Sequence, residues 1–189
     1  RFMAYEQVLR GGQAVFKAFG MPSREQWRAY IENLDINRNY PGIQGIGFSL
    51  AVRPEDRAVH EKSVQTEGFP NYRIRPDGAR PMYTSIIFLE PFDARNKQAF
   101  GYDMFSEPVR RAAMEQARDS GEPSVTGKVR LVQEIDRDVQ AGFLMYLPLY
   151  RAEASLDTVE ARRNALIGFV YSPFRMRNFL EGVLGSQYS

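Results

Sequence analysis

The sequence predicts an α+β fold with a mostly antiparallel sheet, and three observations carry that prediction. Helix-like and strand-like segments follow one another in irregular order, without the strict strand–helix alternation of a parallel sheet. A strong turn signal, Pro76-Asp77-Gly78, separates two strand-like runs, which favours antiparallel neighbours. Apolar residues make up 43% of the 189 residues and charged residues 25%, so the chain is able to bury a proper core.

The helices and strands are expected from apolar spacing and from end signals. Helices are expected over residues 3–19, 23–34, 54–68 and 106–121, with a final one from 176. Ser23, with Gln26 three residues later, predicts a capping box, and Ser106 is the expected N-cap of the fourth helix. Strands are expected at 43–52, 71–75, 82–89, 124–133, 141–150 and 165–171. The charged stretch 151–164 is the best candidate for a subdomain boundary.

Composition excludes several classes of function. The chain has no cysteine and a single histidine, His60, so we expect no metal site and no cofactor, and we interpret His60 as an exposed helix residue. The net charge of +2 comes from interleaved acidic and basic residues, which argues against nucleic-acid binding. Residues 121–128 superficially resemble a phosphate-binding loop, but the spacing is too long. We therefore expect no catalytic residue and no enzyme, and hydrolysis is the least favoured alternative.

Two acidic features are candidate binding sites, the stretch 134–138 and Asp103. The first has three carboxylates at alternating positions, Glu134, Asp136 and Asp138. This pattern favours a solvated loop over a weak cation site. Asp103 lies among Tyr102, Met104 and Phe105, directly before a helix. Such a carboxylate is either a charge that favours the helix dipole or a buried acceptor for a ligand donor, and composition alone favours the first.

No segment reaches the roughly 18–20 apolar residues that span a bilayer. The sequence opens at Arg1 in what reads as the middle of a helix, so we expect a fragment of a larger protein.

Several spaced motifs together resemble a CHASE domain, the cyclase/histidine-kinase-associated sensory extracellular domain. They are residues 40–48 (YPGIQGIGF), 67–70 (EGFP), 83–91, 101–111 (GYDMFSEPVRR) and 142–150. The resemblance implies a stalk helix followed by PAS-like subdomains. Residues 1–40 would then be stalk and lead-in helices, 41–150 a membrane-distal ligand-binding subdomain, and 151–189 a membrane-proximal strand and helix.

The resemblance also implies a site. Asp103 in YDMFS falls on the aspartate with which plant cytokinin receptors bind adenine, in a Leu-Asp-Met-Met-Ser motif. Val125 falls on a pocket leucine, Glu134 near a pocket threonine and Leu147 near a pocket aromatic residue, so Glu134 adds a charge. Apolar walls are expected from four further residues: Tyr83, Ile87, Leu131 and Met145.

The expected function is that of a periplasmic sensor for a small molecule, with an adenine-like or cytokinin-like ligand. The parent protein would be a homodimeric receptor of the inner membrane, with a histidine kinase or diguanylate cyclase as its cytoplasmic output. The alternative is a dimerisation module without a small-molecule ligand.

Overall fold

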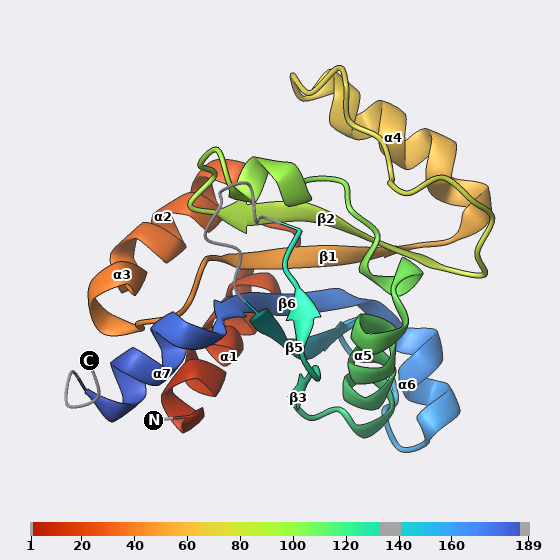
Figure 1. Cartoon of the computed structure of the whole chain (residues 1–189). Coiled ribbons are helices and arrows are strands. Elements are labelled where there is room, and N and C mark those ends of the chain that lie inside the picture. Colours follow the sequence, from red (N-terminus) through yellow and green to blue (C-terminus); the bar gives the residue numbers. More distant parts are fainter. Residues whose placement is uncertain (1, 133–140, 186–189) are drawn as a thin grey trace.

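The fold is built on one antiparallel sheet with helices on both faces (Figure 1). The computed structural model describes residues 2–132 and 141–185. The strand order is β2-β1-β6-β5-β3, and β4 also pairs with β5. The strands are β1 (Ile46–Val52), β2 (Tyr83–Glu90), β3 (Ser124–Val125), β4 (Val129–Arg130), β5 (Ala141–Tyr150) and β6 (Leu166–Arg175).

The helices are distributed along the whole chain. The α-helices are α1 (Phe2–Phe19), α2 (Arg24–Leu34), α3 (Ile36–Asn39), α4 (Arg57–Thr66), α5 (Pro108–Ser120), α6 (Val159–Ala165) and α7 (Met176–Leu184). Short 3-10 helices are η1 (Pro54–Asp56), η2 (Asn96–Ala99) and η3 (Met104–Ser106). Most of the predicted elements are therefore present, and the predicted α+β class is confirmed.

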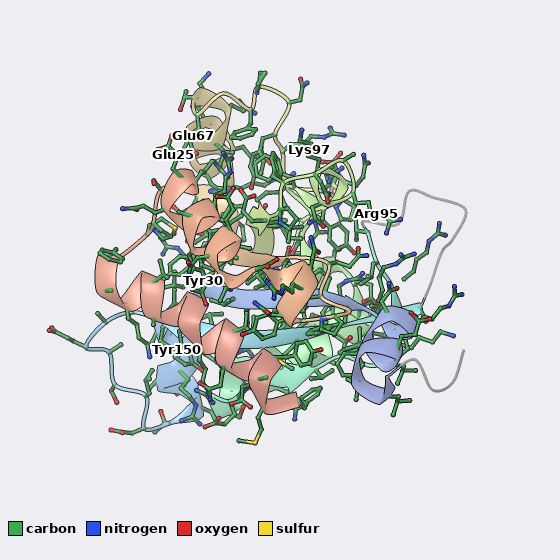
Figure 2. All side chains as sticks on the ribbon, turned by 90° about the vertical axis from the view of Figure 1, so that its left-hand side faces the viewer. Glu25, Tyr30, Glu67, Arg95, Lys97 and Tyr150 are labelled. Atoms are coloured by element: carbon green, nitrogen blue, oxygen red, sulfur yellow. The ribbon has the colours of Figure 1, made fainter. Side chains whose placement is uncertain are left out.

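Two buried clusters lie on opposite faces of the sheet, because successive side chains of a strand point to opposite sides. One face is covered by α1 and α2, which run across it in Figure 2. There Trp27 packs on Phe16 and Phe88, and its indole N–H donates to the backbone oxygen of Ile46 at 3.2 Å. The other face is covered by α5 and by the η2–η3 segment, with Met104 and Met114 buried against it. The sheet is thus buried on both sides.

The capping box at the start of α2 is confirmed. The Ser23 hydroxyl accepts from the backbone N–H of Gln26, and the Gln26 side chain accepts from the backbone N–H of Ser23. The start of α5 differs from the prediction, because Glu107 rather than Ser106 is its N-cap and accepts from the N–H groups of Val109 and Arg110. A carboxylate with two acceptor oxygens satisfies two helix N–H groups at once.

The strands on both sides of the predicted boundary at residue 150 belong to one sheet. β6, expected in a separate membrane-proximal segment, lies between β1 and β5 at the centre of the single sheet. The last strand of the chain therefore lies between two strands that precede it in the sequence. The predicted strand at 71–75 was also wrong: only an isolated bridge joins Arg75 to Tyr102. Glu134, Asp136 and Asp138 lie outside the described residues.

Candidate functional site

Asp103 is fully buried and its carboxylate is held by the chain itself. Its Oδ1 accepts from the backbone N–H groups of Thr84 at 2.8 Å and Phe105 at 3.0 Å, and from the Thr84 hydroxyl at 3.2 Å. Its Oδ2 accepts from Arg80 Nε at 2.7 Å. Asp103 therefore ties β2, η3 and the preceding loop together at one point.

Arg80 connects Asp103 to Tyr83, another predicted ligand residue. The Arg80 guanidinium lies 5.0 Å from the centre of the Tyr83 ring, and the Tyr83 hydroxyl donates to the backbone oxygen of Gly78. Cation–π contact and ion pairing both hold the guanidinium in place. The structure thus brings Asp103 and Tyr83 together around an arginine that the sequence did not single out.

The residues predicted to form the apolar wall lie in two different buried clusters. Ile87, Met145 and Leu147 are buried in the core covered by α1 and α2, whereas Leu131 is buried in the core covered by α5. Residues on opposite faces of a sheet do not line one cavity. These four residues are core residues that fill both sides of the sheet.

Val125, another predicted ligand residue, is on the short strand β3 and is 37% exposed. It is not part of the cluster around Arg80. Glu134 lies outside the described residues.

The prediction that His60 is exposed was wrong, because its side chain is half-buried. Its Nε2 lies 2.7 Å from the Tyr72 hydroxyl, which lies 2.6 Å from the Ser85 hydroxyl of β2. Burial is the main cause that lowers the pKa of His60. This chain of polar groups attaches α4 to the sheet edge.

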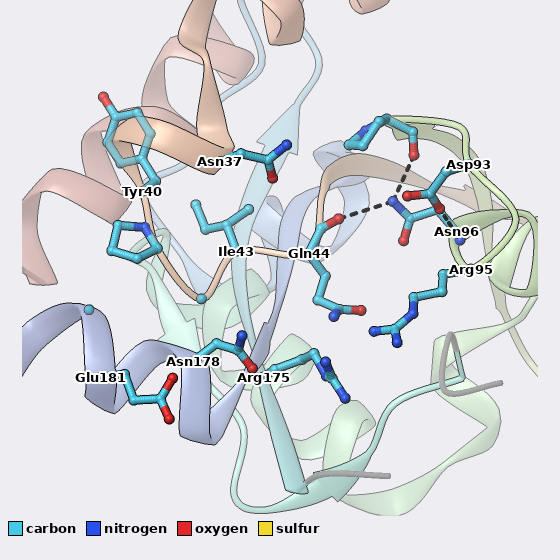
Figure 3. Close-up of a pocket in the computed structure, with 14 residues that line it drawn as sticks. Asn37, Tyr40, Ile43, Gln44, Asp93, Arg95, Asn96, Arg175, Asn178 and Glu181 are labelled. Atoms are coloured by element: carbon cyan, nitrogen blue, oxygen red, sulfur yellow. Dashed lines mark hydrogen bonds between the residues drawn. The ribbon is translucent and has the colours of Figure 1, made fainter. Parts of the chain in front are cut away.

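A polar pocket that sequence reasoning missed lies between three distant segments (Figure 3). The segments are the connection from α3 to β1, the stretch after β2 and the helix α7, and the volume is about 480 Å³. This volume lies in the range of small-molecule sites. Figure 3 shows the side chains of Gln44, Arg95 and Arg175 close to one another, with Asn178 of α7 beside Arg175 and Glu181 farther along α7.

The floor of this pocket contains unsatisfied polar atoms. Asn96 is 1% exposed, and its Oδ1 has no hydrogen-bond partner within the described part of the chain. The same holds for Gln44 Oε1, which is also buried. Most buried polar side-chain atoms in proteins have a partner, so these two oxygens are exceptions that belong to residues of one pocket.

Helix α7 closes one side of the pocket through unusually tight backbone contact. A Cβ atom on Gly42, where φ is +93°, would lie 2.5 Å from Cα of Phe179. A Cβ atom on Gly182 would lie 2.3 Å from Cγ of Pro41. Only glycine at these positions lets the turn before β1 and the helix approach so closely. The position of α7 is therefore coupled directly to the pocket wall.

A second pocket of about 370 Å³ lies beside the loop 68–75 and the residues Lys97, Gln98 and Phe100. Asp103 lines neither this pocket nor the pocket beside α7.

The sequence offered few signals for the pocket beside α7. Its polar residues are single amides, arginines and acids without a motif, and they come together only when β1, β2 and β6 pair. Gly42 was the exception, since a Pro-Gly step directly before a strand indicates a tight backbone position. Within residues 2–132 and 141–185 there is no group of three or more His, Cys, Asp or Glu side chains suited to a metal ion. In the same residues no helix has the length and apolarity needed to cross a membrane.

Comparison with known proteins gives a solved structure of similar fold. The ligand-binding domain of the Pseudomonas aeruginosa PAO1 amino acid chemoreceptor PctC, in complex with GABA, matches with a TM-score of 0.54 at 13% identity. The match covers 99% of this chain and 62% of that chain. It supports the predicted PAS-like arrangement of an antiparallel sheet behind an N-terminal helix.

Comparison of sequences identifies the family. "Hybrid signal transduction histidine kinase A" of Dictyostelium discoideum is 28% identical over an alignment of 159 residues, and the match covers 77% of this chain and 7% of that protein. The chain thus spans a small part of this relative. The family model of the CHASE domain matches residues 20–189. CHASE domains are extracellular sensor domains of membrane receptors and are sensory rather than catalytic. This chain belongs to the CHASE domain family.

Proposed function

We propose that this chain is the extracytoplasmic small-molecule sensor of a membrane-anchored receptor, and that the pocket beside α7 is its sensory site. The receptor's output would be a histidine kinase or a diguanylate cyclase in the cytoplasm. The observation that carries the proposal is the pocket itself, since its wall includes Asn178, Glu181 and Gly182 of α7, the last helix described. A ligand there contacts the helix that we propose leads toward the rest of the receptor.

Signalling from this pocket requires two arrangements of α7 with different ligand affinity. The helix is suited to such movement because none of its residues is buried. Phe179 nevertheless packs on Phe143 and Phe174 of the sheet. A ligand that contacts both α7 and the segment before β1 would favour the arrangement in which the helix packs on the sheet. Dissociation of the ligand would allow the helix to move away.

Asp103 remains a predicted ligand acceptor of adenine-like molecules. Its Oδ2 accepts a hydrogen bond from Arg80, and a carboxylate oxygen with two lone pairs has capacity for one more. The side chain is fully buried, so a ligand N–H group reaches it only if Arg80 moves. The proposal at α7 needs no such movement.

The alternative, a dimerisation module, is favoured by a different observation. Large apolar side chains at both ends of α1 are exposed: Phe2 at 47%, Met3 at 75% and Phe19 at 71%. Exposed apolar side chains along one helix are typical of a contact with another protein chain. A parent homodimer would cover them, and this is compatible with a sensory pocket elsewhere.

A ligand screen tests the proposed function. The Tm of the purified chain is measured in the presence of adenine-type cytokinins, amino acids, dicarboxylates and polyamines. The affinity of each compound that raises the Tm is then measured by calorimetry. We expect at least one of these compounds to bind. At a hundred times its Kd, a ligand stabilises the folded chain by about 2.7 kcal/mol. For a chain of this length that raises the Tm by about 5–10 °C. A chain that binds none of them and only self-associates would be a dimerisation module.

A further inference from the structure

The pocket beside the loop 68–75, called the loop pocket below, has an aromatic wall. Phe100 packs against Phe69 and against Tyr72, and the ring centres lie 4.9 Å apart in both pairs. All three residues line the pocket. Tyr72 is buried, whereas Phe69 and Phe100 are half-buried, so part of each of these two residues stays accessible. A flat apolar group is able to pack on rings that are exposed in this way.

The rings of the loop pocket are held in place by an ion pair outside it. The guanidinium of Arg24 lies 4.7 Å from the ring centre of Phe69 and 5.3 Å from that of Phe100. Arg24 is fixed in turn by Glu67, to which its Nε donates at 2.7 Å. Neither Arg24 nor Glu67 lines the pocket. Because the rings are already ordered, a ligand that packs on them loses little free energy to ordering them.

The charged side chains that line the loop pocket are all cationic. They are Arg73, Arg75 and Lys97, and none of the described residues in the lining is an aspartate or a glutamate. The Lys97 ammonium lies 5.4 Å from the centre of the Phe92 ring and has no ion pair with the described part of the chain. Arg73 has a carboxylate oxygen of the exposed Asp77 at 3.9 Å. A lining with charge of one sign attracts a ligand of the opposite sign, here an anion.

Arg75 has the geometry to bind a carboxylate. Its Nη2 donates to the backbone oxygens of Gln98 at 2.8 Å and Phe100 at 2.9 Å. These two bonds fix the plane of the guanidinium, yet its charge has no carboxylate partner among residues 2–132 and 141–185. The N–H groups of Nε and Nη1 also have no acceptor in those residues. A planar donor group held in this way matches the two oxygens of a carboxylate.

We infer that the loop pocket binds a small aromatic carboxylate, with its ring on Phe69 and Phe100 and its carboxylate at Arg75 and Lys97. A volume of about 370 Å³ lies at the lower end of small-molecule sites and suits a ligand of one or two rings. No ion pair of the described residues has to break, because neither cation has one. Among those residues the loop pocket and the pocket beside α7 share no lining residue, so this is a second site beyond the proposed function.

A titration series tests the ring and the charge of the ligand separately. The chain is titrated in a calorimeter with benzoate, phenylacetate and indole-3-acetate. Each acid that binds is then compared with its uncharged amide and with acetate, which lacks the ring. We expect both comparison compounds to bind at least about tenfold more weakly than the acid. The amide loses the charge-assisted hydrogen bonds, and acetate loses the apolar contact with the rings.

Two variants locate the site, each with a matched control. Arg75→Gln removes the guanidinium, and Arg38→Gln does so at an exposed position of α3 outside the pocket. Lys97→Met removes an exposed ammonium, and Lys62→Met makes the same change on α4. We expect Arg75→Gln to weaken binding about tenfold or more and Lys97→Met about threefold to fivefold, with both controls binding as the parent chain does. The Tm of each variant is measured first, and Lys97→Met carries the test if Arg75→Gln does not fold.

Three results would overturn the inference. Equal binding of an acid and its amide would show that the charge is not recognised. Binding of the acids that both pocket variants leave unchanged would place the ligand elsewhere. If no aromatic carboxylate binds while a compound of the ligand screen does, the loop pocket is not a binding site and the sensory site beside α7 is unaffected.

Discussion

Replacing Asp103 with alanine is expected to destabilise the domain by about 3–5 kcal/mol, because it breaks a buried ion pair from one side. The change leaves Arg80, whose side chain is 17% exposed, without its carboxylate. It also leaves the buried N–H groups of Thr84 and Phe105 without their side-chain acceptor. Urea denaturation monitored by circular dichroism measures the loss.

Asp77→Ala is the matched control for this variant. Asp77 also pairs with an arginine, Arg57 at 3.4 Å, but its side chain is 74% exposed. Exposed pairs contribute about 0–1 kcal/mol, so this variant should unfold almost as the parent chain does. If Asp103→Ala is equally stable and loses only the binding of an adenine-type ligand, then Asp103 is a recognition residue rather than a structural one.

Replacing Gly42 with alanine is expected to cost about 2–4 kcal/mol and to displace α7. The new Cβ atom would overlap the Phe179 backbone at 2.5 Å, and a backbone atom within a helix yields little. The positive φ of +93° adds strain for any residue with a side chain. The free energy of unfolding and the rate at which protease cleaves α7 are the two readouts.

Gly20→Ala separates these two causes. Gly20 also has a positive φ, +73°, but a Cβ atom there meets nothing within 4 Å. It should therefore show the backbone strain alone, about 1–2 kcal/mol, with α7 undisturbed. Equal losses in the two variants would mean that the contact between Gly42 and α7 contributes nothing, and the proposed coupling of α7 to the pocket would lose its support.

The sequence predicted the local structure better than the arrangement of strands. The capping box of Ser23 and Gln26 is local, because both residues lie within one helical turn. β5 was also found with its true bounds, because a ten-residue apolar run bounded by polar residues is a buried strand. Since every inner residue of β5 is buried, the run gives no period-two signal to show which face Met145 and Leu147 occupy.

The candidate site was predicted only in part for the same reason. Asp103 stands out in its motif, but its partner Arg80 lies 23 residues earlier in a loop without any pattern. The pocket beside α7 needs β6 between β1 and β5, and a pairing between residues more than 100 positions apart leaves no local trace. Unsatisfied atoms such as Asn96 Oδ1 appear only after the whole hydrogen-bond network is known.

Hydrogen–deuterium exchange of α7 with and without saturating ligand tests the central claim, that ligand binding beside α7 controls this helix. With a ligand taken from the screen, the amides of residues 176–184 and of the segment 40–44 should exchange more slowly. Those of α4, which does not line the pocket, should exchange at unchanged rates. Protection confined to residues 80–84 and 103–105, with α7 unchanged, would contradict the claim and place recognition at Asp103.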